Sequence, residues 1–197
     1  MKDTARIVII GAGIVGCSTA YHLALLGWSD IVVIEQGPIF ETGGSTSHAP
    51  GLVFQTNPSK TMSLLSQETV KLYSNLELNG NPCFYPVGSM EIATTPERLE
   101  ELKRRIGVGI SYGLDSTMIS PKECLEYNPL LSEKILGAMF VKNDGIAKAV
   151  RAAESMSNSK AVKNSVEFYP HTKVTNIHTV NGKINSIETD KGSIKTE

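Results

Sequence analysis

Runs of apolar residues near the N-terminus alternate with an amphipathic segment. Residues 6–10 (RIVII) contain a run of β-branched residues, which is typical of a strand buried on both faces in a parallel sheet. Residues 17–26 then follow a helical period, and Gly27 ends the predicted helix. Residues 31–34 (IVVI) repeat the buried-strand pattern. Together these segments predict a βαβ unit of about 30 residues.

The rest of the chain predicts a mixture of helices and strands. Thr95 can cap one of the helices and Gly107 can stop it, while Asp144-Gly145 opens another. Asn181-Gly182 lies between two alternating runs and predicts a tight hairpin. The patterns predict helices over 59–78, 96–106 and 146–162, and strands over 82–95, 135–141, 166–169, 173–180, 183–189 and from 192 onward.

Composition and charge narrow the class of protein. The chain has 197 residues, 41% of them hydrophobic, and a net charge of −1, which is typical of a globular protein and gives no sign of a nucleic-acid surface. The three cysteines form no CxxC pair, so we expect reduced thiols and no metal site. No apolar run approaches the roughly 20 residues of a membrane span. The first strand begins so early that no signal peptide fits before it, and the cytoplasm is the expected compartment.

Residues 11–16 (GAGIVG) match the dinucleotide-binding pattern GxGxxG between the first strand and the first helix. Gly11 makes the turn out of the strand, Gly13 lets the backbone approach a pyrophosphate, and Gly16 lets the helix pack closely on the strand. Glu35 ends the second strand, where a carboxylate can accept hydrogen bonds from ribose hydroxyls and disfavours the 2′-phosphate of NADP. The full context predicts an adenine dinucleotide, either FAD or NAD.

The loop of residues 43–51 (GGSTSHAPG) follows this pattern closely in the chain. Its small residues supply donors and backbone freedom beside an extended, anionic cofactor. His48 within it has three interpretations: a surface residue, a hydrogen-bond partner of a flavin, or the nucleophile that bonds to the flavin methyl group. The residues alone leave these open. For His22, His171 and His178 we expect no functional role, because none has a cysteine or carboxylate at ligand spacing.

These residues resemble the dimethylglycine oxidase and dehydrogenase family, which has sarcosine dehydrogenase as a close relative among the D-amino-acid-oxidase-like flavoproteins. The resemblance covers essentially the whole chain. It is strongest in residues 7–16, 36–38 and 43–59 (GGSTSHAPGLVFQTNPS). The pattern GST-x-H-A-x-GL is specific to this group, whereas the βαβ pattern is shared by many flavoproteins.

The resemblance implies that FAD is attached covalently to His48 through its 8α-methyl group. Together with the glycines of the GxGxxG pattern, the resemblance gives these cofactor-binding residues: Gly11, Gly13, Ile14, Val15, Gly16, Glu35, Gln36, Ser45, Thr46, Ser47, His48, Leu52 and Val174. The implied reaction is oxidative demethylation of N,N-dimethylglycine, in which a hydride passes from the substrate methyl carbon to flavin N5 and leaves an iminium. The catalytic residues and a tetrahydrofolate-binding region are expected beyond residue 197.

The implied fold is α/β: a doubly wound, Rossmann-like FAD-binding domain interrupted by part of an α+β substrate domain. We expect residues 1–80 and 144–197 to form the FAD-binding domain and residues 81–143 to form the substrate-domain segment. The pattern stops within a strand, so we expect the chain to be truncated at its C-terminus and inactive by itself.

Several alternatives stay open at this stage. The enzyme could resemble sarcosine dehydrogenase instead, and the βαβ unit alone also permits an NAD-dependent dehydrogenase. A non-catalytic relative would bind FAD and regulate a partner. The expected partner of the enzyme is a small methylated glycine, with no nucleic acid and no membrane. The electron acceptor, either oxygen or an electron-transfer protein, is not indicated.

Overall fold

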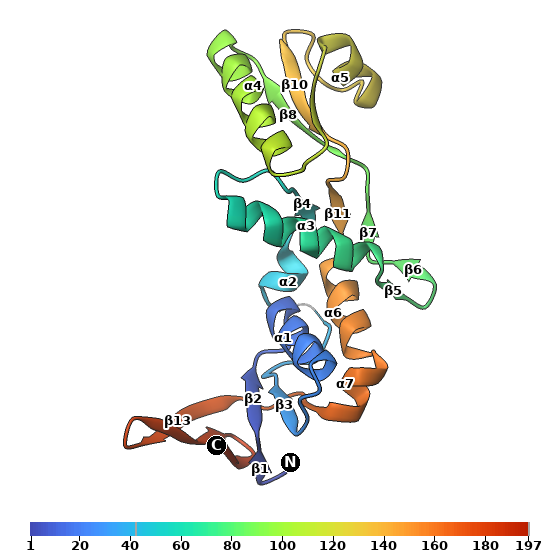
Figure 1. Cartoon of the computed structure of the whole chain (residues 1–197). Coiled ribbons are helices and arrows are strands. Elements are labelled where there is room, and N and C mark those ends of the chain that lie inside the picture. The colour runs from blue at the N-terminus through green and yellow to red at the C-terminus, as the bar shows by residue number, and fades with distance from the viewer. Residues whose placement is uncertain (42, 197) are drawn as a thin grey trace. The chain divides into compact units, whose positions relative to one another are not determined.

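The computed structural model describes residues 1–41 and 43–196, and the chain divides into two compact units (Figure 1). The first unit comprises Met1–Pro50, Leu76–Cys83 and the chain from Lys148 onward. The second comprises Gly51–Asn75 and Phe84–Ala147. Residue 197, the last of the predicted third segment, lies outside the described residues. Residues 51–75, which the predicted segments assign to the FAD-binding domain, pack in the second unit.

A three-stranded parallel sheet forms the centre of the first unit. Its order is β12 (Val166–Tyr169), β3 (Ile31–Ile34) and β2 (Ile7–Ile10). The strands run in register, with Ile31 between Ile7 and Val166. Every residue of β3 is buried, because layers cover both faces of this central strand. The pattern at residues 31–34 predicted this buried strand correctly, whereas β2, predicted to be buried on both faces, is only partly buried and ends in the exposed Ile10.

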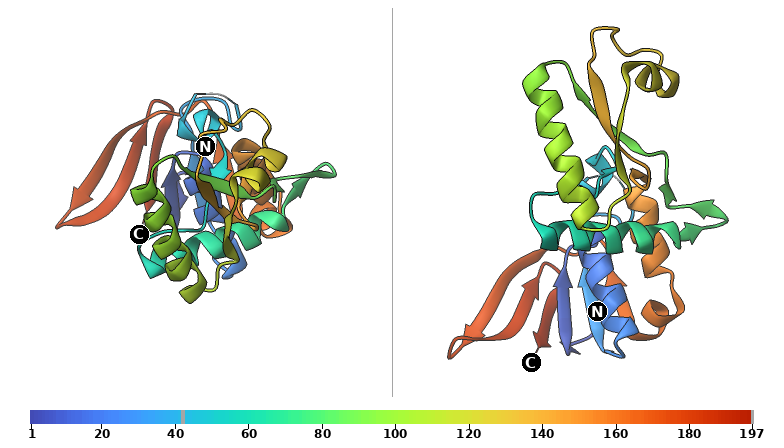
Figure 2. Two further views of the ribbon diagram at one scale, coloured as in Figure 1. Left: turned by 90° about the horizontal axis from the view of Figure 1, so that it is seen from above. Right: turned by 45° about the horizontal axis from the view of Figure 1, so that its top comes forward.

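Helices cover one face of the parallel sheet (Figure 2). They are α1 (Ile14–Leu25), α6 (Ala149–Ser157) and α7 (Lys160–Ser165), and α1 packs against both others. Val33 points to this side and contacts a cluster that includes Cys17 and Ala153. Small residues on α1 let the helix approach the strands closely.

An antiparallel layer covers the other face. Val32 and Ile34 alternate with Val33 and pack against Ile187 and Ile194. This layer has the order β1 (Thr4–Ala5), β15 (Gly192–Thr196), β14 (Lys183–Thr189) and β13 (Val174–Val180), with only β1 and β15 parallel. The Rossmann-like class is confirmed, but a sheet covers the face where a doubly wound fold would carry helices.

The second unit contains an antiparallel sheet between two helices. The sheet has the order β8 (Ser89–Ala93), β10 (Gly137–Val141) and β9 (Ser116–Ile119). Met139 and Val141 face α4 (Pro96–Ser111), where Leu102 is fully buried. Ala138 faces α5 (Pro121–Tyr127) and contacts Cys124. This alternation along β10 buries both faces of the strand.

A smaller sheet in the same unit combines segments that lie far apart in the sequence. Its order is β4 (Leu52–Val53), β11 (Gly145–Ala147) and β7 (Phe84–Tyr85), and α3 (Lys60–Ser74) packs on it. Asp144, at the start of β11, is completely buried. Its Oδ1 accepts hydrogen bonds from the N–H of Gln55 (3.0 Å) and from Gln55 Nε2 (2.9 Å), and its Oδ2 accepts one from Ser89 Oγ (2.6 Å).

Several predicted elements are wrong in extent or type. Residues 146–162, predicted as one helix, form β11, α6 and the start of α7. Residues 82–95 contain two separate strands, β7 and β8, and α4 continues past Gly107 to Ser111. The sequence patterns missed β9 and α5. They also missed the short elements α2 (Ser45–His48), β5 (Glu77–Leu78) and β6 (Asn81–Pro82). The hairpin at Asn181-Gly182 is confirmed, with φ of 52° and 75° at its two residues.

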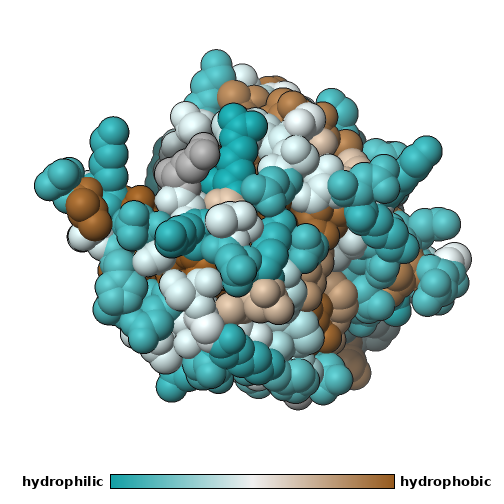
Figure 3. All heavy atoms as spheres, turned by 90° about the horizontal axis from the view of Figure 1, so that it is seen from below, coloured by the Kyte–Doolittle hydropathy of each residue, from teal (hydrophilic) through white to brown (hydrophobic). Residues whose placement is uncertain are grey.

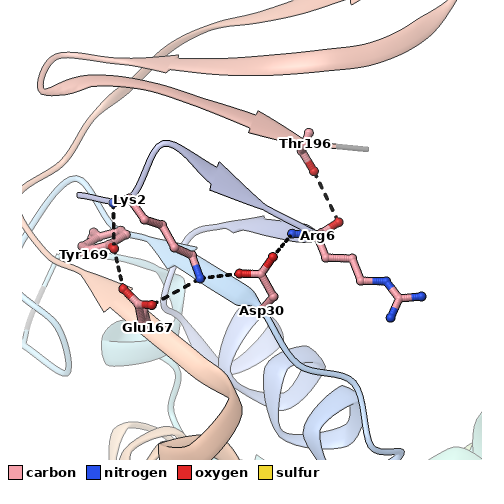
Figure 4. A network of polar contacts seen from close by, with 6 residues as sticks. All are labelled: Lys2, Arg6, Asp30, Glu167, Tyr169 and Thr196. Carbon is pink, nitrogen blue, oxygen red and sulfur yellow. Dashed lines mark hydrogen bonds and ion pairs between the residues drawn. The ribbon is translucent and has the colours of Figure 1, made fainter.

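A polar network joins the N-terminus to the amino ends of the parallel strands (Figure 4). The ammonium of Lys2 lies 2.6 Å from Asp30 and 3.2 Å from Glu167, and the N–H of Lys2 donates to the hydroxyl of Tyr169. The hydrogen bond from Lys2 lowers the pKa of Asp30, and bonds from Tyr169 and then Lys2 lower the pKa of Glu167. Burial opposes the charge of Lys2, but its two carboxylate partners raise its pKa. The surface seen from below this end of the unit is mainly hydrophilic (Figure 3).

Candidate functional site

The turn between β2 and α1 brings the backbone of the strand close to the helix. Gly11 has a φ of 100°, which strongly favours glycine. A Cβ placed on Gly16 would lie 1.9 Å from the carbonyl oxygen of Gly11 and 3.3 Å from Ile9. Only glycine therefore lets α1 start so near the strand. The N–H groups of its first turn point out of the helix at the carboxyl edge of the sheet, where they can bind an anion.

Glu35, at the end of the neighbouring strand β3, holds the glycine turn at the same edge of the sheet. Its Oε2 accepts a hydrogen bond from the N–H of Ala12 (2.9 Å), and its Oε1 accepts one from the N–H of Gly37 (3.0 Å). The carboxylate thus joins the glycine turn to the segment after β3. It lies at the place where the sequence predicted a partner for ribose hydroxyls, and its negative charge disfavours a phosphate at that place.

The loop that precedes His48 folds into the short helix α2 and contacts the glycine turn. Thr46 Oγ1 accepts a hydrogen bond from the N–H of Ile14 at 2.9 Å. Ser47 Oγ donates to the carbonyl of Gly44 (2.9 Å) and accepts from the N–H of Gly43 (3.1 Å). His48 is the last residue of α2, and its side chain is exposed.

These segments enclose a hollow of about 560 Å³ within the first unit. Ten of the predicted cofactor residues line it: Gly11, Gly13, Ile14, Val15, Gly16, Glu35, Gln36, Ser45, Thr46 and Ser47. Val174 lines a neighbouring hollow of about 220 Å³, together with Gly11, Glu35 and Gln36. His48 is not among the residues that line either hollow, and Leu52 belongs to the second unit.

Sequence reasoning missed several residues that line the larger hollow. Phe40 and Glu41 come from the segment after β3, and Val150 and Ala153 come from α6. Val150 and Ala153 lie within the segment 146–162, which the sequence predicted to be a helix. No local signal could show that α6 packs beside α1, since the two helices lie more than a hundred residues apart in the sequence.

The chemistry of the hollow suits an extended dinucleotide. No Lys or Arg is found among the described residues that line it, so backbone N–H groups and the positive end of α1 would hold a pyrophosphate. Apolar side chains such as Val15 and Phe40 offer surface to flat rings. The close approach at Gly13 and Gly16, the N–H groups of Val15 and Gly16 and the carboxylate of Glu35 therefore fit the adenosine diphosphate part of FAD.

Other reactive groups lie elsewhere. Burial raises the pKa of the Cys17 thiol behind the glycine turn, which keeps it protonated. His178 Nε2 lies 2.8 Å from Glu188 across the β13–β14 hairpin, a neighbour that the sequence spacing did not reveal. Within the described residues, no three His, Cys, Asp or Glu side chains gather as a metal site would require. No helix in the described part of the chain is long and apolar enough to cross a membrane.

Comparison with known proteins identifies related sequences over nearly the whole chain. Residues 6–197 match the family profile described as FAD dependent oxidoreductase. Dimethylglycine dehydrogenase, mitochondrial, of Rattus norvegicus is 32% identical over 98% of this chain and 23% of its own length. Sarcosine dehydrogenase, mitochondrial, of Homo sapiens is 30% identical over 100% of this chain and 22% of its own length. The predicted family resemblance is confirmed.

Two further matches bear on fold and function. The pyruvate dehydrogenase phosphatase regulatory subunit, mitochondrial, of Mus musculus is 36% identical over 98% of this chain and 22% of its own length. The crystal structure of L-proline dehydrogenase from P. horikoshii superposes with a TM-score of 0.88 and 26% identity, over 100% of this chain and 52% of that chain. The chain thus spans less than a quarter of the length of its matched curated relatives.

Proposed function

The chain belongs to the FAD dependent oxidoreductase family, and we propose that it is the FAD-binding part of an enzyme that demethylates N,N-dimethylglycine. One observation supports this assignment most directly. The glycine turn, Glu35 and residues 45–47 of α2 line one hollow, and His48 is the next and last residue of α2. The relative named dimethylglycine dehydrogenase shares 32% identity with this chain, which supports the choice of substrate.

Each part of the site has a distinct role in this proposal. The N–H groups of Val15 and Gly16 in the first turn of α1 bind the pyrophosphate, and Gly13 and Gly16 keep the backbone near enough for those bonds. Glu35 accepts hydrogen bonds from the ribose hydroxyls. Gln36 and Val174 lie at the adenosine end, and the residues that contact FAD from the loop are Ser45, Thr46, Ser47 and Leu52.

His48 is the proposed point of covalent attachment. Its exposed imidazole offers a ring nitrogen that could replace one hydrogen of the flavin 8α-methyl group. The protons of the ring nitrogen and of the methyl group would be lost, the two electrons would pass to the flavin ring, and an acceptor such as oxygen would reoxidise it. Bound FAD would supply a two-electron acceptor, so that the substrate methyl group loses a hydride and the amine becomes an iminium. We assign the substrate-binding and catalytic side chains, and a tetrahydrofolate-binding region, to a part of the protein outside these residues.

A precipitation experiment tests the attachment. We expect that flavin stays with the acid-precipitated protein in the wild type, while His48→Ala releases all of it into the supernatant. His22→Ala is the matched control, since His22 is an exposed histidine on α1 and is expected to leave attachment unchanged. Flavin that remains in the pellet of His48→Ala would refute the assignment.

A regulatory protein is the second candidate. The relative named as a regulatory subunit shares 36% identity with this chain, a higher value than the dehydrogenases described above. Such a protein would bind FAD through the same hollow and would not turn over methylated glycines. Reduction of the bound flavin by dimethylglycine, followed at 450 nm without oxygen, favours the enzyme, and reduction by sarcosine alone favours the sarcosine alternative.

The partners and the compartment are also proposals. We propose a small methylated glycine as the substrate and neither nucleic acid nor membrane as a partner. Oxygen consumption during turnover would identify oxygen as the electron acceptor; its absence would favour an electron-transfer protein. The cytoplasm is the proposed compartment, although the relatives are named as mitochondrial, and cell fractionation distinguishes the two.

A further inference from the structure

The attachment loop supplies the cap of the cofactor helix. The residue before the first turn of α1 is Gly13, which has no side chain to accept a hydrogen bond from the helix. Ile14 is the first residue of α1, so its N–H has no partner within the helix. Thr46 Oγ1, from a segment 32 residues later, accepts that hydrogen bond at 2.9 Å.

The fit between Thr46 and the turn is close. A Cβ placed on Gly13 would lie 2.9 Å from Thr46 Oγ1, nearer than such atoms are found in proteins. Gly13 therefore leaves the room that the hydroxyl occupies. This contact gives Gly13 a second purpose, apart from the approach of a pyrophosphate.

The loop is built so that fixing Thr46 also fixes His48. Both residues lie in the single turn of α2, two positions apart. Ser47 closes the turn through its bonds to Gly43 and Gly44. On the other side, Gly51 has a φ of 83°. Gly51 is held by a hydrogen bond from the N–H of Ala147, whereas a Cβ on Gly43 or Gly44 would meet no atom within 4 Å. The two glycines before the turn therefore give the backbone freedom, which the contact at Thr46 restricts.

We propose that Thr46 is a positioning residue that holds the His48 turn against the start of α1 and thereby presets the histidine for attachment to FAD. The inference deepens the proposed function and rests on it for the attachment step. The hydrogen bond of Thr46 joins the loop to the same end of α1 that binds the pyrophosphate in the proposed function. A hydrogen bond of this kind contributes about 1 kcal/mol, so its loss changes the population of the fixed loop about fivefold.

The hydrogen bond itself can be tested without cofactor. Amide hydrogen exchange in the ligand-free full chain should be about fivefold faster at Ile14 in Thr46→Val, which keeps the shape but removes the hydroxyl. Thr46→Ser keeps the acceptor and should retain the wild-type rate. The N–H of Cys17, which bonds to the carbonyl of Gly13 within the helix, is the internal control. Unchanged exchange at Ile14 in Thr46→Val would overturn the proposal, and Thr46→Ala serves in its place if the valine variant does not fold.

The positioning role is tested by the rate of attachment at saturating FAD. We expect Thr46→Val to form acid-stable flavin about fivefold more slowly than wild type and Thr46→Ser to match wild type. Affinity for FAD is measured separately in the His48→Ala background, where no bond can form. A weaker affinity with an unchanged saturated rate would mean that Thr46 only binds cofactor, and the positioning role would be wrong.

The two proposals fail differently. If wild-type protein forms no acid-stable flavin, the attachment at His48 is wrong, and the role of Thr46 is then decided by exchange at Ile14 and at the amides of α2. Faster exchange at both in Thr46→Val would support the coupling of the loop to the helix. Faster exchange at Ile14 alone would overturn it.

Discussion

One methyl group, added at two helical glycines, should have opposite effects. A Cβ on Gly16 in α1 would lie 1.9 Å from the carbonyl oxygen of Gly11, whereas a Cβ on Gly107 in α4 would meet no atom within 4 Å. Neither glycine has a positive φ. Gly16→Ala and Gly107→Ala therefore make the same change in chemistry and differ in the space that the new methyl group meets.

The size of each effect follows from two terms. Alanine is roughly 0.5–1 kcal/mol more favourable than glycine within a helix, so Gly107→Ala should raise the free energy of unfolding by about that amount. Gly16→Ala gains the same term. Its methyl group, however, lies more than 1 Å inside the shortest contact found in proteins, and against backbone that cannot turn away. Overpacking costs about 1–3 kcal/mol, and the upper end applies here, which leaves a net loss of about 2 kcal/mol.

Urea unfolding followed by circular dichroism measures both free energies. A cofactor titration adds the functional test, because α1 must move away from Gly11 in Gly16→Ala and take its N–H groups away from the pyrophosphate. We expect about tenfold weaker binding of FAD to Gly16→Ala, equivalent to about 1.4 kcal/mol, and wild-type binding to Gly107→Ala. Equal stabilisation by both substitutions would refute the close contact between helix and strand. A less stable Gly16→Ala with unchanged affinity would show that this contact does not shape the cofactor site.

Two further predictions concern stability. Asp144→Ala leaves both donors of Gln55 buried without an acceptor and should lower the free energy of unfolding by about 2–5 kcal/mol. Asp144→Asn keeps one acceptor oxygen and should lower it by about 1 kcal/mol. Equal losses of the two variants in urea unfolding would contradict this account. The carboxylate of Asp30 has a pKa lowered by Lys2, so its contribution is present above its unfolded value and is lost as pH falls through the lower folded value. Below about pH 4, wild-type protein should therefore lose stability more steeply with falling pH than Lys2→Met does. The difference in the free energy of unfolding should be less than about 1 kcal/mol, because the pair is exposed. Parallel pH profiles of the two proteins would refute this prediction.

The first fifty residues were largely predictable because their contacts are local. The apolar runs of β2 and β3 and the glycine spacing between them define a strand, turn and helix that pack on one another. The geometry at Gly11 and Gly16 agrees with the roles that the pattern predicted. The sequence could not show which layer covers the far face of the sheet, since β14 and β15 pack on β3 from a distant part of the chain.

Errors arose where tertiary contacts or caps interrupt a helical period. Gly145 starts a strand because β11 pairs with β4 and β7, so closely that a Cβ there would lie 2.1 Å from the carbonyl oxygen of Tyr85. Ser159 caps a new helix after α6. α5 could have been found, since Ser120 and Glu123 form a capping box with Pro121 in the first turn. By contrast, the sequence could not predict the contact of Thr46 with Ile14, because that contact depends on how the loop folds back onto α1.

Similarity over the length of this chain bears on cofactor binding and not on catalysis. A regulatory subunit and two dehydrogenases all match at least 98% of this chain, at 30–36% identity. In this chain the matched length includes the hollow and its loop, which offer backbone groups and one carboxylate and hold no residue assigned to the substrate. Proof of bound flavin would therefore leave enzyme and regulator equally supported. Reduction of that flavin by a methylated glycine separates them, because only the enzyme would pass a hydride from that substrate to the flavin.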